Sequence, residues 1–293
     1  MPEVSSQPYP VARTSFHTVH ADGVDVFYRE AGRADAPVVL LLHGFPSSSH
    51  MYRELIPRLA SRYRVIAPDL PGFGFTVVPE ARNYTYTFDS LAKTIGAFVD
   101  ALKLTKYAIY VFDYGAPVGF RLAIAHPERI TGIISQNGNA YEEGLSDAWN
   151  PIQKYWEAPT AENRAALEQF LTLDATRWQY THGVANPEQV VPESYTLDAA
   201  LLDRPGIKEI QLDIFLNYAS NVALYPTFQK YFRDSQPPLL AIWGKNDPFF
   251  LPAGAEAYRR DIPKATVTLL DTGHFALETH VDEIATAIFN LLQ

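Results

Sequence analysis

Residues 107–119, YAIYVFDYGAPVG, carry the strongest structural signal in this chain. The apolar run Tyr107–Phe112 is typical of a buried strand, and the glycine-bearing segment after Asp113 indicates a sharp turn into a helix. Because burying a carboxylate is costly, an acid that ends a core strand favours a charge presented at the turn. Two interpretations follow. Asp113 caps the next helix, or it is a nucleophile that forms an ester on the enzyme without needing a base.

Further apolar runs also end at polar or turn-forming residues, as expected for parallel strands covered on both faces. These runs and the residues that follow them are Val38–Leu42 before His43-Gly44-Phe45-Pro46, Arg64–Leu70 before Pro71–Gly74, Leu239–Trp243 before Asp247, and Thr266–Leu270 before His274. In open parallel sheets, ligands bind at the carboxyl ends of the strands. The sequence therefore predicts that Asp113, Asp247 and His274 meet at one edge.

Composition excludes several classes of function. The chain has 293 residues and a net charge of −9, with no basic run, so neither nucleic acid nor an anionic membrane is expected as a partner. It has no cysteine and no metal-binding spacing, so we expect no metal and no cofactor. Residues 1–9 lack the pattern of a signal peptide, and no run is long enough to span a membrane, so a cytoplasmic location is the expectation. No feature of the sequence sets the oligomeric state.

The apolar pattern divides the chain into two domains. Residues 14–30 alternate like two strands joined at Asp22-Gly23, and strands then alternate with amphipathic segments to about Gly138. Residues 139–232 lack strand-like runs, and prolines separate short helical stretches there. We therefore predict an α/β core from residues 1–138 and 233–293, with a mostly parallel sheet covered by helices, and an inserted helical cap from residues 139–232. The prolines are Pro151, Pro159, Pro187, Pro192, Pro205 and Pro226, the helical stretches include residues 161–172, and the cap tryptophans Trp149, Trp156 and Trp178 suit a lid over an apolar pocket.

With these motifs in their order and spacing, the chain resembles the α/β-hydrolases that use an aspartate nucleophile, the group of epoxide hydrolases and haloalkane dehalogenases. The resemblance covers nearly the whole sheet domain. It rests on His43–Pro46, Asp69–Gly74, the turn at Asp113, the stretch from Gly119 through His126–Arg129, Asp247, and Gly273–Phe275. It implies the α/β-hydrolase fold, with Asp113 in place of the usual serine and with the chain order of nucleophile, acid and histidine.

The resemblance also implies roles for the site residues. Asp113 attacks an electrophilic carbon, His274 activates the water that hydrolyses the resulting ester, and Asp247 orients the imidazole. The backbone N–H groups of Phe45 and Tyr114 hold the oxyanion. A structural alternative remains for Asp247, which precedes Pro248 and suits a turn.

Ring opening of an epoxide needs an acid beside the alkoxide, and epoxide hydrolases use two cap tyrosines for it. The segment 153–159 resembles the stretch that carries the first, which corresponds to Tyr155. The segment 216–221 resembles the second, but Ala219 stands at the tyrosine position and Tyr218 comes one residue early. One residue on a helix is about 100° of rotation, so Tyr218 is expected to be poorly aimed.

Dehalogenation is the alternative, and a departing halide needs N–H donors. Dehalogenases usually have a tryptophan where this chain has Tyr114, and often Asn or a charged residue where it has Phe45. The HGFP loop and Tyr155 favour hydrolysis of a small apolar epoxide by water, with Trp156, Tyr218 and Phe275 as further pocket candidates. A third hypothesis is a non-catalytic α/β-hydrolase that binds a small ligand, which the intact acid–base set disfavours.

Overall fold

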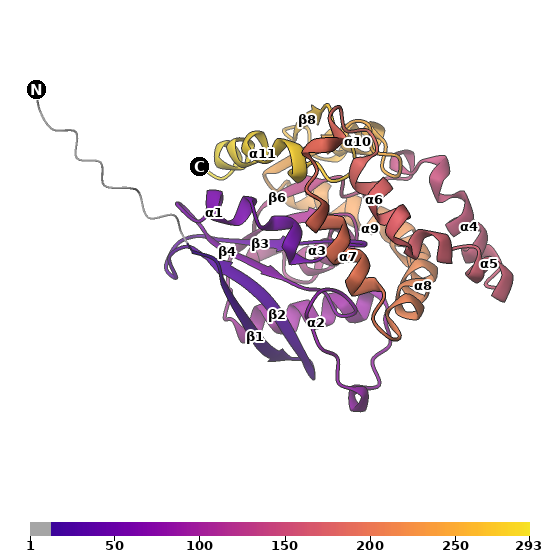
Figure 1. The fold of residues 1–293 in the computed structure, drawn as a ribbon. Helices are drawn as coiled ribbons and strands as arrows, with labels where there is room; N and C mark the ends of the chain where they lie inside the picture. The colour runs from indigo at the N-terminus through magenta and orange to yellow at the C-terminus, as the bar shows by residue number, and fades with distance from the viewer. Residues whose placement is uncertain (1–12) are drawn as a thin grey trace, which may run out of the picture.

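The computed structural model describes residues 13–293 and contains one eight-stranded sheet (Figure 1). Residues 1–9, on which the signal-peptide expectation rests, lie outside the described part. The strands are β1 (Ser15–Ala21), β2 (Val24–Ala31), β3 (Val38–Leu42), β4 (Arg64–Pro68), β5 (Tyr107–Phe112), β6 (Ile130–Gln136), β7 (Leu239–Gly244) and β8 (Thr266–Leu270). Their order across the sheet is β1-β2-β4-β3-β5-β6-β7-β8.

The sheet is parallel from β4 to β8, and only the two pairs that involve β2 are antiparallel. The predicted hairpin between β1 and β2 is confirmed, because Ala21 pairs with Val24 across a two-residue turn at Asp22-Gly23. Both turn residues have positive φ, +51° and +76°, as the type I′ form of two-residue hairpin turns requires. The predicted α/β fold with a mostly parallel sheet is confirmed.

Eleven α-helices accompany the sheet in the part of the chain that the structure describes. They are α1 (Leu55–Leu59), α2 (Phe88–Ala101), α3 (Gly115–Ala125), α4 (Asn150–Glu157), α5 (Ala161–Ala165), α6 (Leu173–Thr181), α7 (Pro192–Leu202), α8 (Ile207–Asn217), α9 (Ala219–Ser235), α10 (Pro252–Asp261) and α11 (Leu277–Leu291). No helix among residues 13–293 combines the length and apolar character needed to cross a membrane.

The central strands are buried on both faces because alternate side chains enter two separate cores. In β5, Ile109 and Val111 pack with the helices α2 and α3, whereas Tyr110 and Phe112 pack with α1 and α11. Every residue of β5 is buried. A continuous apolar run is therefore the pattern that this position in the sheet demands.

The chain between β6 and β7 holds helices α4 to α9, which Figure 1 shows gathered at one end of the sheet. The predicted helix over residues 161–172 is broken into α5 and a 3₁₀ turn at Glu168–Leu171. The prediction that Pro226 separates helices is wrong, because α9 runs through it. Phe228 and Phe232 of α9 pack on Phe120 of α3, with ring centroids 5.4 and 5.2 Å apart, and this packing offsets the hydrogen bond that proline removes.

The junction between β5 and α3 depends on close approach of the backbone to β3. A Cβ atom built on Gly115 would lie 2.0 Å from the carbonyl oxygen of Leu42. Only glycine lets the first turn of α3 pass so close to the end of β3. This contact fixes the position of the residue that precedes the helix.

We predict that Gly115→Ala destabilises the protein by about 1–3 kcal/mol, because the strand and the helix must move apart to admit a methyl group. Gly96→Ala is the matched control. Gly96 lies inside α2, and a Cβ atom at this position would meet only Leu122 Cδ2, at 3.6 Å. There the substitution should stabilise by about 0.5–1 kcal/mol through helix propensity. Urea unfolding of both variants measures the contrast, and equal effects would contradict the close-approach argument.

Candidate active site

Asp113 lies at the turn between β5 and α3 in a left-handed backbone conformation, with φ of +48°. Such a conformation is costly for a residue with a side chain and is typical of the strained turn that carries a nucleophile. The side chain is 6% exposed and lines a cavity rather than capping the helix. Helix α3 has no side-chain cap, so the structure removes the capping interpretation of Asp113.

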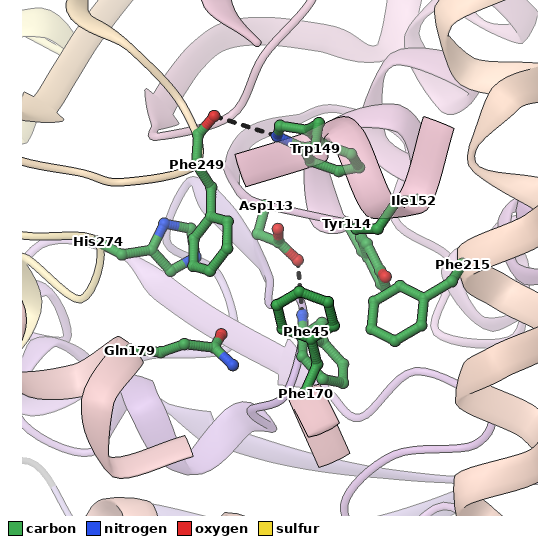
Figure 2. A pocket seen from close by; sticks show the side chains of 10 residues that line it. All are labelled: Phe45, Asp113, Tyr114, Trp149, Ile152, Phe170, Gln179, Phe215, Phe249 and His274. Atoms are coloured by element: carbon green, nitrogen blue, oxygen red, sulfur yellow. Dashed lines mark hydrogen bonds between the residues drawn. The ribbon is translucent and has the colours of Figure 1, made fainter. Parts of the chain in front are cut away.

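The loop after β3 meets this turn directly. The backbone N–H of Phe45 donates to Asp113 Oδ1 at 2.6 Å (Figure 2). The approach requires Gly44, because a Cβ atom there would lie 2.2 Å from the same oxygen. The N–H of Tyr114 also faces the carboxylate and helps to stabilise its charge. Both backbone groups predicted to hold the oxyanion thus lie at the Asp113 carboxyl group.

His274 and Asp247 lie together in the loops after β8 and β7. His274 Nδ1 and Asp247 Oδ2 are 2.7 Å apart, and both side chains are buried. Asp247 accepts two further hydrogen bonds of 2.7 Å, from Asn137 Nδ2 and from the backbone N–H of Phe249. Three donors therefore balance the burial of this carboxylate. The arrangement orients the imidazole of His274, and Figure 2 shows its ring beside Asp113.

The hydrogen bond to Asp247 determines which nitrogen of His274 is free. Because an ionised carboxylate only accepts, Nδ1 carries the proton and Nε2 is left with a lone pair. Burial acts to lower the pKa of His274, but the charge and hydrogen bond of Asp247, together with the charge of Asp113, hold that pKa above its ordinary value. The imidazole is thus suited to taking a proton.

Burial raises the pKa of Asp113 from 3.8 to about 6, against the opposing effects of His274 and of the two backbone N–H groups. The desolvated carboxylate is less stabilised than one in water and hence more reactive toward an electrophile. Near neutral pH it is still mostly ionised. The site therefore places an ionised carboxylate next to an imidazole whose Nε2 is able to take a proton.

The cavity above Asp113 has a mostly aromatic and aliphatic wall. Ten residues line it: Phe45, Asp113, Tyr114, Trp149, Ile152, Phe170, Gln179, Phe215, Phe249 and His274 (Figure 2). The sheet loops supply the reacting groups, and helices between β6 and β7 supply much of the apolar wall. An apolar wall with a few polar groups at one end suits a small apolar molecule.

Tyr155 does not take the expected place across from Asp113. Its ring is buried and is not part of the cavity wall, and its hydroxyl accepts a hydrogen bond of 3.0 Å from Arg164. Two acids of α8, Glu209 and Asp213, bind the same guanidinium at 2.7 and 2.8 Å. This ion-pair cluster holds the Tyr155 hydroxyl away from the cavity. The motif around Tyr155 carries no information about these contacts with Arg164.

The three further pocket candidates also lie outside the wall. Trp156 donates its indole N–H to the backbone carbonyl of Phe215 at 2.7 Å. Tyr218, one residue out of register, is fully buried behind Tyr114, with their ring centroids 5.7 Å apart. Phe275 stacks on Tyr180, with their ring centroids 3.7 Å apart. These rings form a second layer that supports the wall.

Sequence reasoning missed two polar residues. Asn137 follows β6 in a left-handed conformation and joins Asp247 to the backbone of β7, since its Oδ1 accepts from the Gly244 N–H at 2.9 Å. The position of Asn137, an amide directly after a buried strand, is a weak sequence signal that would have identified it. Gln179, in helix α6, lines the cavity, and no pattern around it marks it as special.

His43 supports the site without entering it. Its Nε2 accepts from the Leu70 N–H at 2.9 Å, so its Nδ1 carries the proton and lies 3.1 Å from the Gly44 carbonyl oxygen. Burial lowers the pKa of His43, which keeps the ring neutral. Within residues 13–293, no group of three or more His, Asp and Glu side chains is arranged to hold a metal ion.

We predict that Asp113→Asn stabilises the protein at pH 8 and much less at pH 4. Because the folded-state pKa of about 6 exceeds the ordinary 3.8, the unfolded chain loses this proton first. The stability of the parent therefore falls as the pH rises from about 4 to about 6 and stays lower above it. The neutral amide avoids this loss, which is on the order of 2–3 kcal/mol. Thermal unfolding across this range measures it, with the exposed Asp271→Asn as the control that should show no such gain.

Comparison with known proteins agrees with this architecture. The α/β-hydrolase fold family matches residues 37–281. A Saccharomyces cerevisiae protein named as an uncharacterized hydrolase is 53% identical over 281 residues, covering 94% of this chain and 96% of its own. Haloalkane dehalogenase 2 of Mycobacterium tuberculosis is 27% identical over 266 residues, 86% of each chain. A solved epoxide hydrolase from Vigna radiata shares the fold, with a TM-score of 0.73 at 23% identity, covering 94% of this chain and 97% of its own. This chain therefore belongs to the α/β-hydrolase fold family and is a hydrolase of that family.

Proposed function

We propose that this hydrolase opens a small apolar epoxide through a covalent alkyl ester on Asp113. The observation that carries the proposal is the Asp113 carboxylate itself. It lies in an apolar cavity with one oxygen bonded to the Phe45 N–H, which leaves the other for attack on carbon. A serine at this turn would need a base to become a nucleophile, whereas an ionised carboxylate does not.

The second step uses the neighbouring residues. Water adds to the ester carbonyl, His274 Nε2 takes one of its protons, and Asp247 stabilises the imidazolium that forms. The N–H groups of Phe45 and Tyr114 hold the negative charge on the former carboxylate oxygen. Collapse of this intermediate breaks the acyl–oxygen bond, and His274 returns its proton to the departing alcohol oxygen. Asp113 is regenerated with an oxygen from water.

The ring oxygen needs a proton donor when its bond to carbon breaks. Among the ten residues of the cavity wall, Tyr114 carries the one hydroxyl, and this hydroxyl is buried without a hydrogen-bond partner. Burial and the charge of Asp113 raise the pKa of Tyr114 well above 10, but an alkoxide is a still stronger base. We therefore give the phenol of Tyr114 the role that Tyr155 was expected to play. After Tyr114 has given up its proton, the second proton of the hydrolytic water restores its phenol.

Hydrolysis of a carbon–halogen bond is the second candidate, because it would use the same ester and because haloalkane dehalogenase 2 is a relative. A halide is best held by N–H donors in the cavity. The indole N–H groups of Trp149 and Trp156 are already bonded to the backbone carbonyls of Phe249 and Phe215, at 3.1 and 2.7 Å. The amide N–H of Gln179 is unpaired in the cavity and is a donor that a halide could use. The phenol of Tyr114 can also transfer a proton, which an alkoxide needs and a halide does not, so it favours an oxygen leaving group.

We predict that His274→Gln forms the ester on Asp113 but does not release it, because the base acts on the water step. After exposure to terminal epoxides, the intact mass should rise by the mass of the whole epoxide, on a peptide that contains Asp113. After separate exposure to chloroalkanes, it should rise only by the alkyl group, because chloride leaves. Asp113→Ala should form no adduct and should lose turnover to background. If the parent hydrolyses a compound and His274→Gln forms no adduct with it, the two-step scheme is wrong. If the parent hydrolyses none of the compounds, a non-catalytic binding protein is favoured.

We predict that Tyr114→Phe slows epoxide opening by about 10²–10⁴-fold, the usual contribution of a general acid. Tyr155→Phe is the matched variant, since it removes one buried hydroxyl that Arg164 already satisfies. It should cost about 1 kcal/mol in stability and leave the rate of ester formation within severalfold of the parent. Rapid-mixing measurements of ester formation compare the two. The reverse ranking would return the acid role to Tyr155.

A further inference from the structure

Gln179 is the second cavity residue with a buried polar group that has no partner. Its side chain is 3% exposed, and its Nε2 atom makes no hydrogen bond. The large majority of buried polar groups in proteins are hydrogen-bonded, and an exception inside a cavity needs an explanation. Unlike other buried groups without a partner, such as the phenols of Tyr52 and Tyr218, Gln179 lines the cavity over Asp113.

The amide is poorly placed to serve the epoxide opening described above. In the view of Figure 2, Gln179 and the Tyr114 hydroxyl lie on different sides of Asp113. The nitrogen end of the amide is turned toward the rings of Phe45 and Phe170 rather than toward His274. It therefore faces the part of the cavity that Phe45 and Phe170 line.

We propose that Gln179 determines specificity by donating a hydrogen bond to an oxygen substituent of the substrate. Apart from Gln179, the wall on that side is aromatic, which leaves an acceptor atom no alternative partner there. A site with a buried unpaired donor rejects an analogue that lacks the acceptor, because binding then leaves the donor unsatisfied. The substrate class is thus an oxygen-substituted epoxide, such as a glycidyl ether, rather than a plain alkyl epoxide. This inference rests on the proposed function for its reacting group.

The chain offers a matched control in Gln211, a fully buried glutamine of helix α8. Its Nε2 donates to the Gly72 carbonyl oxygen at 3.1 Å, and it does not line the cavity. Gln179→Met and Gln211→Met remove the same amide with little change in volume. Gln211 Oε1 is also buried without a partner, so the loss of the bond from Nε2 should lower the melting temperature of Gln211→Met only modestly. Loss of an unpaired N–H should leave the melting temperature of Gln179→Met equal to that of the parent or higher.

The test compares methyl glycidyl ether with 1,2-epoxypentane, which differ by an ether oxygen in place of a methylene group. We expect the ratio of kcat/KM for the ether to that for the alkyl epoxide to fall about tenfold in Gln179→Met and to be unchanged in Gln211→Met. An unchanged ratio in Gln179→Met would overturn the inference. So would an equal loss on both substrates, which would place the amide in the chemistry, or a markedly lower melting temperature, which would make Gln179 structural.

A binding measurement separates this inference from the proposed function, because it needs no turnover. The corresponding diols, 3-methoxy-1,2-propanediol and 1,2-pentanediol, are titrated into the parent and both variants by calorimetry. The Kd of the methoxy diol should rise about tenfold relative to that of pentanediol in Gln179→Met alone. If neither epoxide is hydrolysed and this binding contrast remains, the epoxide reaction is wrong and the role of Gln179 stands. If both epoxides are hydrolysed and the contrast is absent, the inference fails alone.

Discussion

The hydrogen bond from the Phe45 N–H to Asp113 Oδ1 joins the loop after β3 to the turn after β5, and the rest of the site depends on it. It holds a carboxylate in a cavity that would otherwise favour its protonation, since burial already raises the pKa of Asp113 to about 6. In the proposed reaction, the same N–H group stabilises the negative charge that develops when the ester is hydrolysed. Close approach of the loop requires glycine at position 44, so a backbone contact sets the chemistry.

The sheet and its functional edge were predictable because their signals are local. Apolar runs with polar residues just beyond them identified the strands that place Asp113, Asp247 and His274, and the structure brings the last two within 2.7 Å. Asp22-Gly23 likewise marks its own turn. A parallel strand that is buried on both faces is apolar throughout. The first polar residue after such a run therefore indicates where the strand ends.

The cavity wall was not predictable, because it depends on contacts between residues far apart in the chain. Tyr155 is turned away by Arg164, and Arg164 is held in turn by acids of α8 that lie about fifty residues further along. Pro226 was expected to end a helix, but packing on Phe120 outweighs its local preference. The wall therefore follows from how the helices pack, and motif spacing carries little of that information.

A perturbed pKa alone would not have identified this site. Asp198 of helix α7 is as deeply buried as Asp113, and burial raises its pKa further, to about 8. Its carboxyl group, however, faces the Tyr180 hydroxyl at 2.5 Å, and neither residue lines the cavity over Asp113. Tyr180 in turn stacks on Phe275, directly after His274, so this acid braces the helices against the catalytic loop. What distinguishes Asp113 is the cavity above it together with a base whose free nitrogen is set by Asp247. Those are properties of geometry rather than of charge.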